Sequence, residues 1–505
     1  MHNPLYDSLF GVHAGKSTPF LRLAEGEVIT HEAFLAMAAR IAHVLVQHGV
    51  SPGDRVAVQV AKSPQALALY AACAQAGVVF IPLNTAYTVE ELSYFVENSG
   101  ASLIVCDQRS AADLTPLSET VGARIETLNA DGSGQLMAAA QAMPSEFETV
   151  ARRGDDLAAF LYTSGTTGRS KGAMLTQDNL LSNCKTLTQA WRFTETDVLL
   201  HALPIFHTHG LFVATNIILA CGGSMFFMPK FDVDEIIRYL PDATSMMGVP
   251  TFYTRLLGDA RFTADLTRHM RLFVSGSAPL LAETHNQFEA RTGHRILERY
   301  GMTETNMNTS NPYDGARKAG TVGLPLPDVE LKITDASTGE MLPQGEVGQI
   351  EVRGPNVFKG YWQMPEKTAA ELREDGFFIT GDLGLVDEDG YVHIVGRNKD
   401  LIISGGYNIY PKEIELVLDE QPGVLESAVI GVPHADFGET VLGLIVPSKD
   451  QTPDLEQIKA ATKASLARFK HPRELIVVDE LPRNTMGKVQ KNVLREAYKG
   501  LFVPA

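Results

Sequence analysis

Several features that mark whole classes of protein are scarce in this 505-residue chain. Its four cysteines (Cys73, Cys106, Cys184 and Cys221) are scattered, with no CxxC pair and no spacing typical of a zinc site. They indicate reduced thiols in a cytoplasmic protein rather than a disulfide framework. Positive charge is also scarce. The formal net charge of −17 argues against nucleic acid or an anionic membrane as the main partner.

Long apolar runs are missing as well. The most apolar segment, residues 66–83, is interrupted by Gln75 and Gly77, and is better interpreted as a core helix that leads into a strand. Residues 1–15 have neither a basic stretch nor an apolar core, so we expect no signal peptide. The sequence predicts a cytoplasmic protein that does not insert into membranes.

The chain changes in character along its length. Helix-like and strand-like segments alternate over residues 30–110 and 180–300, which predicts mostly parallel sheets covered on both faces. After residue 320, short strands and glycine-rich turns indicate antiparallel β structure. We expect an α/β and α+β fold in which residues 1–398 form a large N-terminal domain and residues 399–505 a small α+β domain.

Residues 163–172, TSGTTGRSKG, follow a strand-like apolar segment and combine glycines, hydroxyls and cations. Glycines let successive backbone N–H groups converge on an anion, and the hydroxyls and Lys171 add donors. The stretch therefore predicts a phosphate-binding loop, with a mobile surface linker as the alternative. It is not the loop of P-loop NTPases, because Gly168 is followed by Arg169 and Ser170 before Lys171.

Three further clusters contain residues suited to nucleotide chemistry. In LERYGMTET, 297–305, Glu304 is a natural magnesium contact beside a phosphate loop, although such a residue alone is more often solvated at a helix N-terminus. In TGDLG, 380–384, Asp382 could accept both hydroxyls of a ribose, although a structural turn is the better interpretation of this motif alone. In PRNTMGKVQKNVL, Lys488 occupies a turn before a final helix, where a lone lysine is usually solvated.

These motifs, together with GRNKD at 396–400, occur in an order that resembles the adenylate-forming superfamily of acyl-CoA synthetases, luciferases and peptide-synthetase adenylation domains. The resemblance covers nearly the whole chain and implies that the small C-terminal domain is mobile. It also implies a two-step reaction. A carboxylate attacks the α-phosphate of Mg·ATP to give acyl-AMP and pyrophosphate, and the thiol of coenzyme A then displaces AMP. Mg²⁺ is the implied cofactor, with ATP and coenzyme A as co-substrates.

The resemblance assigns nucleotide contacts residue by residue. The residues implied to hold the β- and γ-phosphates are Thr163, Ser164, Gly165, Thr166, Thr167, Gly168 and Lys171. Those implied around the adenine and the α-phosphate are Gly276, Ser277, Ala278, Pro279, Tyr300, Gly301 (as a tight-turn glycine) and Thr303. Asp382 and Arg397 would grip the ribose, and Glu304 would hold magnesium.

In the C-terminal part, Lys488 resembles the family lysine that neutralises charge developing on the α-phosphate. Lys399 falls at the hinge position. Gly405 and Gly406 would line the pantetheine path, with a plain strand turn as the alternative. Acetylation of Lys488 would remove its charge, so a lysine acetyltransferase and a deacetylase are candidate partners.

The acid to be activated is suggested by Arg299, because mono-acid synthetases commonly have a small residue there. A buried cation needs an anionic partner, and a second carboxylate on the substrate would supply it. The segment ERYGMTET resembles the malonyl-CoA synthetases, which points to malonate or methylmalonate as the small-molecule substrate. The alternatives are that Arg299 pairs with Glu298 or another structural acid, or contacts AMP, and that the substrate is another short acid.

The motif PIFHTHG, 204–210, implies that His207 lies beside the reacting carboxylate, with a core histidine as the alternative. Thr208 and Met307 would shape the rest of the acyl pocket. Other classes fit less well. An amino-acid adenylation module would need an acid near residues 200–235, where Asp232 looks like a turn residue. A luciferase-type oxygenase is disfavoured only by the apparent charge of the pocket.

Overall fold

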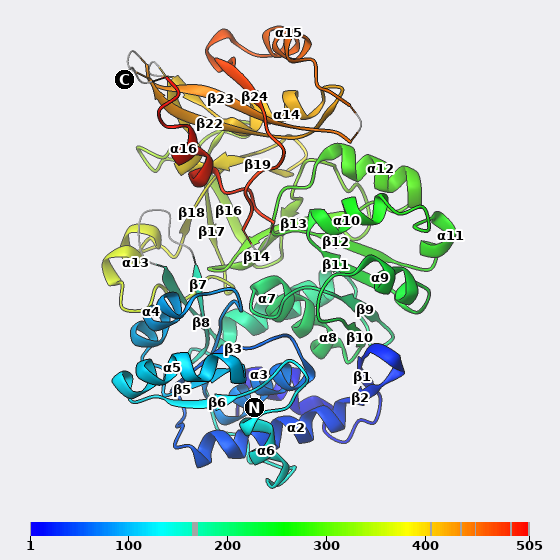
Figure 1. The fold of residues 1–505 in the computed structure, drawn as a ribbon, viewed down its shortest axis with the longest axis vertical. Coiled ribbons are helices and arrows are strands. Elements are labelled where there is room, and N and C mark those ends of the chain that lie inside the picture. The colour runs from blue at the N-terminus through cyan, green and yellow to red at the C-terminus, as the bar shows by residue number, and fades with distance from the viewer. Residues whose placement is uncertain are drawn as a thin grey trace.

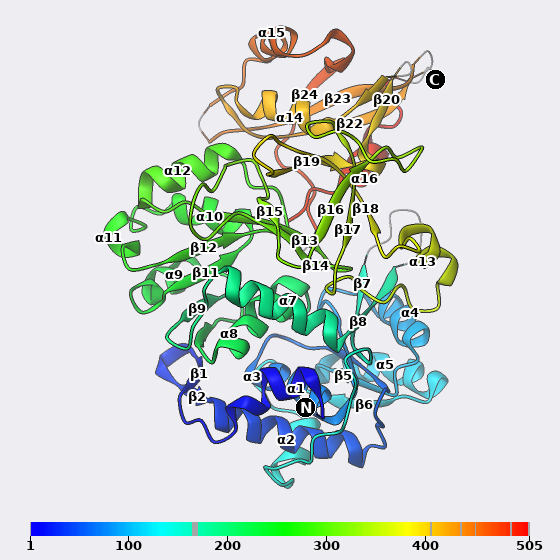
Figure 2. The ribbon, with the colours of Figure 1, turned by 180° about the vertical axis from the view of Figure 1, so that it is seen from behind.

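The computed structural model describes residues 2–163, 170–404, 407–434, 437–449, 451–484 and 487–502. The strands of these residues form four sheets. Three of the sheets, with the helices around them, occupy the lower and middle parts of the molecule in Figures 1 and 2, and the fourth lies at the top with α14, α15 and α16. The predicted combination of mixed parallel sheets, an antiparallel part and a smaller α+β part is confirmed. No helix within these ranges is both long and apolar enough to cross a membrane.

The first sheet has six strands in the order β6-β5-β3-β4-β7-β8, and its pairings are parallel except β7–β8. Its strands are β3 Arg55–Gln59, β4 Val79–Pro82, β5 Leu103–Cys106, β6 Arg124–Thr127, β7 Leu157–Thr163 and β8 Lys171–Thr176. The nearby helices are α1 Pro4–Leu9, α2 His31–Gln47, α3 Pro64–Ala76, α4 Val89–Ser99, α5 Gln108–Val121 and α6 Gln135–Gln141.

The second sheet has nine strands in the order β15-β14-β13-β12-β11-β9-β10-β1-β2. Its strands are β1 Pro19–Arg22, β2 Val28–Thr30, β9 Val198–His201, β10 Ser224–Phe227, β11 Ser245–Gly248, β12 Leu272–Ser275, β13 Leu297–Met302, β14 Asn306–Ser310 and β15 Leu324–Pro325. Its helices are α7 Gln177–Ala190, α8 Asn216–Cys221, α9 Val233–Tyr239, α10 Pro250–Leu257, α11 Ala264–Thr267 and α12 Ala282–Thr292, together with the π-helix His209–Thr215.

The third sheet is antiparallel, in the order β16-β17-β18-β19, with bounds Glu330–Thr334, Gly348–Arg353, Phe378–Val386 and Val392–Arg397. The helix α13 Pro365–Glu371 lies between β17 and β18 in the chain. The fourth sheet contains β20 Ile402–Ser404, β21 Tyr407–Ile409, β22 Val424–His434, β23 Gly438–Pro447 and β24 Glu474–Val477. Its helices are α14 Pro411–Asp419, α15 Leu455–Ser465 and α16 Lys491–Tyr498.

Helix α3 illustrates how the sequence specifies the core. The Ser63 side chain caps its start by accepting from the N–H of Ala66, Pro64 occupies the first turn, and Gly77 ends it in the left-handed conformation with φ 70°. Every residue from Ala66 to Ala76 is buried. A helix that is apolar on all sides belongs inside a protein, which is why the segment that might suggest a membrane span is instead a core helix.

Two histidines are buried together near the N-terminus. The rings of His13 and His31 lie 4.3 Å apart, and His31 stacks on Phe20. Their Nε2 atoms contact the backbone oxygens of Leu219 and Gly223 at 2.5 and 3.2 Å. Burial lowers the pKa of His31 to about 4, and the charge of a protonated His13 contributes to this shift. The folded protein therefore keeps His31 neutral.

This burial predicts a pH-dependent stability. Because the pKa of His31 is lower in the folded protein, its contribution is present above pH 6.5 and is lost as the pH falls towards 4. We expect His31→Gln to lose about 2 kcal/mol less unfolding free energy than the wild type between pH 7.5 and 5.0. Urea denaturation at both pH values measures this, with the exposed His2→Gln as control. Equal losses in all three proteins would contradict the prediction.

Candidate active site

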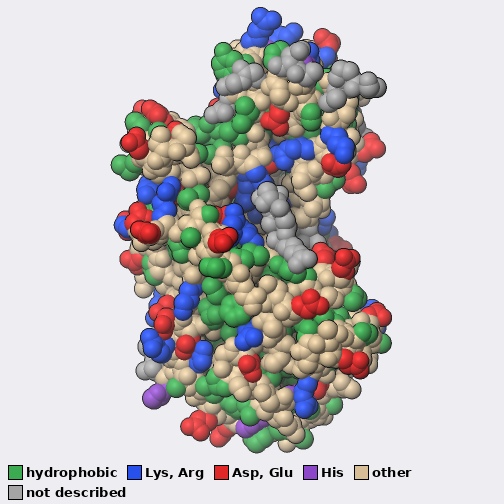
Figure 3. Space-filling model, turned by 90° about the vertical axis from the view of Figure 1, so that its left-hand side faces the viewer, with side chains coloured by type: hydrophobic (Ala, Val, Ile, Leu, Met, Phe, Trp, Pro, Cys, Tyr) green, Lys and Arg blue, Asp and Glu red, His purple; other side chains and the backbone are tan. Residues whose placement is uncertain are grey.

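The residues singled out in the sequence meet between the middle and upper parts of the molecule. The region is formed by the hairpin β13–β14, the loop after β12, the start of the π-helix His209–Thr215, the strands β18 and β19 and the turn before α16. Figure 3 shows Lys and Arg side chains gathered around a hollow at this level. Although the whole chain is acidic, this part of its surface is locally cationic.

The turn between β13 and β14 carries Thr303 and Glu304. The pairing slips between Tyr300 and Gly301, and a Cβ at Gly301 would lie 1.8 Å from the backbone oxygen of Asn306. The prediction that Gly301 forms the tight turn is therefore wrong. Gly301 lies at the end of β13, and it is glycine because the two strands approach closely there. Glu304 is 5% exposed, so it is not a solvated helix N-terminal residue.

Arg299 is a buried cation without an acid. Arg299 is 4% exposed, and its Nε and Nη2 atoms have no hydrogen-bond partner among the described residues. Burial lowers its pKa to about 9, which still leaves the guanidinium charged at neutral pH. Successive strand residues point to opposite faces, so Glu298 points away and lies 3.5 Å from His285 instead. The alternative pairing of Arg299 with Glu298 is not formed.

The loop after β12 packs directly on this cation. A Cβ at Gly276 would lie 2.3 Å from the Cζ of Arg299, so only glycine leaves room for the guanidinium. Ser277 adopts φ 71°, and its hydroxyl lies 3.2 Å from Nδ1 of His209. A residue other than glycine at positive φ is uncommon and often marks a functional site. Ala278 is half-buried and Pro279 exposed.

His209 begins the seven-residue π-helix, a rare element that often occurs at functional sites. Its Nε2 atom, the Nε2 of His207 and the hydroxyl of Thr208 are all buried without a hydrogen-bond partner among the described residues. Burial lowers the pKa of His207 to about 4 and that of His209 well below its usual value, and the charges of Lys488 and Arg299 respectively add to this. Sequence reasoning missed His209. Its signal was the spacing of two histidines around Thr208.

The π-helix is held in place by Lys62, a partly buried lysine. Lys62 Nζ lies 2.8 to 2.9 Å from Nδ1 and the backbone oxygen of His201 and from the backbone oxygen of Leu203. His201 Nε2 in turn lies 2.9 Å from the oxygen of Gly210 and 3.1 Å from the hydroxyl of Thr215. This network fixes the segment that carries His207, Thr208 and His209.

Met307 lies on the other side of the hairpin from the solvent and is 2% exposed. Its Cε would be 2.7 Å from a Cβ at Gly301. The side-chain amide of Asn183 donates to its backbone oxygen (2.8 Å) and accepts from its N–H (3.2 Å). Asn183 on α7 thus fixes the backbone of Met307 with both halves of one amide.

Tyr300, Asp382 and Arg397 form one connected group. The hydroxyl of Tyr300 donates to Asp382 Oδ2 at 2.6 Å, and Arg397 Nε lies 2.7 Å from Asp382 Oδ1. Asp382 is opposite Arg397 in the β18–β19 pairing and is 3% exposed, so it lies in a strand and not in a structural turn. Each carboxylate oxygen retains a second lone pair for another donor.

Glu304 and Lys171 are linked through Tyr361. The hydroxyl of Tyr361 lies 3.0 Å from Glu304 Oε1 and 2.7 Å from Glu371 Oε2, and Lys171 Nζ lies 4.1 Å from the centre of the Tyr361 ring. Burial raises the pKa of Glu304. Thr163, which is opposite Lys171 in the β7–β8 pairing, has a buried hydroxyl without a partner among the described residues.

Lys488 reaches this site from the C-terminal part. It lies on the turn that begins at Asn484, whose side chain accepts from the N–H of Lys488, and Gly487 has φ 74°. The side chain remains accessible to solvent, but its ammonium lies among protein groups. Loss of surrounding water lowers its pKa to about 8, and the charge of Arg397 adds to this.

The remaining predicted residues are placed as follows. Lys399 is exposed on the short 3₁₀ turn Asn398–Asp400, between the third and fourth sheets. Ser164, Gly165, Thr166, Thr167 and Gly168 of the glycine–hydroxyl loop, and Gly405 and Gly406, lie outside the described residues.

Comparison with known proteins accounts for this arrangement. A family model described as AMP-binding enzyme matches residues 13–362, and one described as AMP-binding enzyme C-terminal domain matches residues 413–488. The chain belongs to the AMP-binding enzyme family. It is 37% identical over 482 residues to a malonate–CoA ligase of Arabidopsis thaliana. The alignment covers 89% of this chain and 79% of that relative.

Crystal structures of MatB from Rhodopseudomonas palustris are 57% identical to this AMP-binding enzyme and cover 99% of it and 100% of the MatB chain. The TM-score is 0.97 with ATP-bound MatB and 0.87 with apo MatB. This enzyme therefore adopts an arrangement closer to that of the ATP-bound structure. The position of Lys488 beside Asp382 and Arg397 is part of that arrangement.

The packing of Gly276 on Arg299 can be tested by stability. We expect Gly276→Ala to cost about 1–3 kcal/mol, because the added methyl overlaps the guanidinium. Combined with Arg299→Met the cost should shrink, giving a coupling of about 1 kcal/mol or more in urea denaturation. Gly258→Ala, where the nearest atom to a Cβ is 3.4 Å away, is the matched control. If the two stability changes were strictly additive, the methyl at position 276 would not contact the guanidinium of Arg299.

Proposed function

We propose that this enzyme is a malonate–CoA ligase that forms AMP. It joins malonate, or a methyl-substituted malonate, to coenzyme A through an acyl-adenylate, and it releases AMP and pyrophosphate. The observation that carries the choice of acid is the buried guanidinium of Arg299, which among the described residues has two unpaired donor atoms and no acid beside it. An isolated buried charge is costly unless a ligand supplies its partner, and a carboxylate matches the two donors of a guanidinium.

The surroundings of Arg299 favour a small dianion. Among the described residues, His207, Thr208 and His209 each present a buried polar atom without a partner. We assign Arg299, with His209 and Ser277 beside it, to the distal carboxylate. His207 then lies by the reacting carboxylate, and Thr208 and Met307 shape the space around the central carbon. Another short mono- or dicarboxylic acid is the alternative.

For the nucleotide, we assign Asp382 and Arg397 to the ribose, Tyr300 to the adenine and Thr303 to the α-phosphate. Lys171, Thr163 and the loop that follows Thr163 bind the β- and γ-phosphates. Gly276, Ser277, Ala278, Pro279 and Gly301 complete the nucleotide side of the site. Ser277 therefore lies between the nucleotide and the acid, which is consistent with its contact to His209.

Mg²⁺ fits the donor set of this site. Glu304 is a buried carboxylate 3.0 Å from the Tyr361 hydroxyl. Within the described residues, no group of three or more His, Cys, Asp or Glu side chains could hold a metal ion by itself. A single carboxylate together with phosphate oxygens is a common way to bind Mg²⁺. When bound with ATP, the ion would neutralise part of the triphosphate charge. Glu304 would hold it there.

The residues of the chain suggest how adenylation proceeds. Arg299 and the histidines orient malonate, so that its free carboxylate attacks the α-phosphorus while the bond to pyrophosphate breaks. Lys488 places a positive charge where negative charge develops on the α-phosphate and the bridging oxygen. Lys171 and the neighbouring loop hold the departing pyrophosphate.

For the second half-reaction we propose that residues 399–505 form a mobile domain that rotates about Lys399. This rotation withdraws Lys488 and brings the segment around Gly405 and Gly406 towards the adenylate, where the thiol of coenzyme A displaces AMP. We place the enzyme in the cytoplasm, where its buried thiols stay reduced.

The choice of acid is tested first by AMP formation from ATP and coenzyme A with malonate, methylmalonate, succinate, acetate and butyrate at equal concentration. We expect malonate or methylmalonate to be strongly preferred. Arg299→Met should lower kcat/KM for malonate about 100-fold, because a charge-assisted pair is lost, and should leave ATP affinity unchanged. Unchanged malonate turnover in this variant would overturn the assignment.

Stability separates this role from a structural one. Because Arg299 has no acid partner, Arg299→Met should leave the melting temperature of the free enzyme equal or raise it. A structural cation would instead lower it. Preference for acetate or butyrate would leave the adenylating mechanism standing but remove malonate as the substrate.

The role of Lys488 predicts a pH profile. Adenylation needs the charged ammonium, whose pKa in the free enzyme is about 8, so kcat/KM for adenylation should fall as the pH rises through 8. Lys488→Ala, or acetylation of Lys488, should lower adenylation about 100- to 1,000-fold. Thioester formation from added malonyl-AMP should survive, because Lys488 leaves the site in that step. Full adenylation activity of acetylated enzyme would contradict both its role and control by an acetyltransferase and a deacetylase.

A further inference from the structure

Lys171 has an acidic neighbour that the reaction does not require. Its Nζ lies 3.4 Å from Oε2 of Glu371, at the end of α13, and 4.1 Å from the centre of the Tyr361 ring. Both side chains are mostly buried, 17% exposed for Lys171 and 22% for Glu371. The lysine proposed to bind phosphate is therefore held by a carboxylate of its own chain.

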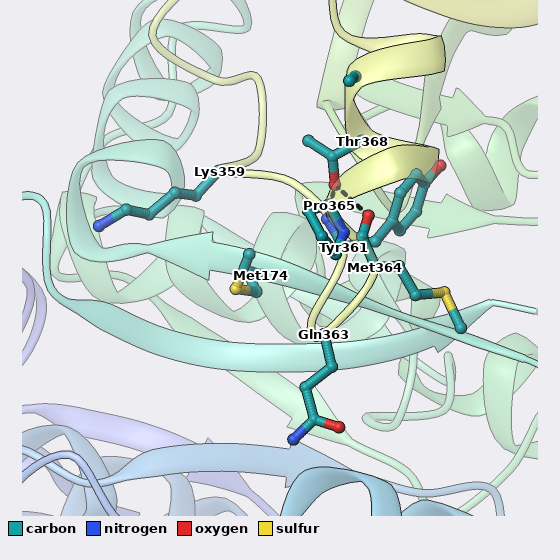
Figure 4. Close-up of a pocket in the computed structure, with 8 residues that line it drawn as sticks. Met174, Lys359, Tyr361, Gln363, Met364, Pro365 and Thr368 are labelled. Carbon is teal, nitrogen blue, oxygen red and sulfur yellow. Dashed lines mark hydrogen bonds between the residues drawn. The ribbon is translucent and has the colours of Figure 1, made fainter.

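The position of Glu371 is fixed by α13. The backbone N–H of Tyr361 donates to the hydroxyl of Thr368 at 2.9 Å, and that hydroxyl donates to the backbone oxygen of Met364 at 3.0 Å (Figure 4). The Tyr361 hydroxyl donates to Glu371 Oε2 at 2.7 Å. These contacts tie the middle and the C-terminal end of α13 to Tyr361, so Glu371 faces Lys171.

Glu371 is negatively charged at neutral pH. Burial alone would raise its pKa, but hydrogen bonds from Lys367 and Tyr361 and the charge of Lys171 bring the pKa below its usual value. Its two oxygens are shared, with Lys367 Nζ 2.6 Å from Oε1 and Lys171 beside Oε2. A phosphate that reached Lys171 would therefore meet a negative charge next to it.

A phosphate that binds Lys171 while the ammonium stays beside Glu371 brings two negative groups close together, so the phosphate and the carboxylate oppose each other. We propose that Glu371 is a positioning residue that holds Lys171 in the empty enzyme and competes for it with ATP and pyrophosphate. The competition weakens both ligands by the same amount. It also gives Lys171 a partner when pyrophosphate leaves, which favours release of that product. This inference rests on the proposed function, because it takes Lys171 as a phosphate ligand.

The test compares ligand affinities of Glu371→Gln with those of the wild type by isothermal titration. We expect Kd for ATP and Kd for pyrophosphate to fall by the same factor, about two- to five-fold, the range for a partly exposed ion pair. Kd for AMP, which lacks the β- and γ-phosphates, should not change, and neither should KM for malonate. The matched control is Glu366→Gln, an exposed residue of the same helix, which should change none of these values.

Weaker or unchanged binding of ATP and pyrophosphate by Glu371→Gln would overturn the inference, as would an equal change in AMP binding. A second cycle locates the cause. In a Lys171→Ala background, Glu371→Gln should have no effect on ATP affinity. If Lys171→Ala alone binds ATP normally, the phosphate role proposed for Lys171 fails. If it weakens ATP but Glu371→Gln changes nothing, only the competition by Glu371 fails.

Discussion

The site is organised around a positive charge that the protein leaves uncompensated. Arg299 is buried, and the one acid next to it in the chain, Glu298, points to the other face of the strand and lies beside His285. Gly276 lets the loop after β12 close over the guanidinium. The free enzyme bears the cost of an unpaired buried cation, and an anionic ligand removes it. The shape and charge of the acyl pocket follow from this constraint.

Elsewhere in the site the opposite rule applies to Asp382 and Lys171, which already have partners. Asp382 is bonded to Tyr300 and Arg397, and Lys171 lies beside Glu371. In the proposed function the nucleotide adds to or replaces contacts that already exist at Asp382 and Lys171, whereas the acid fills vacant ones around Arg299. Under that proposal, affinity for ATP is moderated by internal competition, and the acid is selected by a strong requirement for negative charge.

The third feature of the site is the contact between the C-terminal part and the third sheet. Lys488 comes from the turn before α16, whereas the groups that lower its pKa or oppose that shift, Arg397 and Asp382, come from β18 and β19. The proposed adenylation site therefore needs the C-terminal part to lie against the rest of the chain. The higher TM-score with ATP-bound MatB than with apo MatB agrees with this arrangement.

Much of the fold could be predicted from local sequence. The capped, mostly apolar α3 and the alternating strands around it depend on neighbours in the chain, so their pattern is visible in the sequence. The motifs also predicted which residue types gather at a nucleotide. The slip at Gly301 and the strand position of Asp382 were not visible, because both depend on the register in which neighbouring strands pair.

The sequence by itself determined the family, the sheet architecture and the presence of an unusual arginine before the YGMTE motif. Tertiary structure decided that Arg299 has no acid partner among the described residues and that His209 contacts Ser277 next to it. It also decided that Glu371 faces Lys171. These facts depend on contacts between side chains that are far apart in the sequence. A buried charge is a functional signal only when its surroundings are known, and the surroundings are supplied by packing.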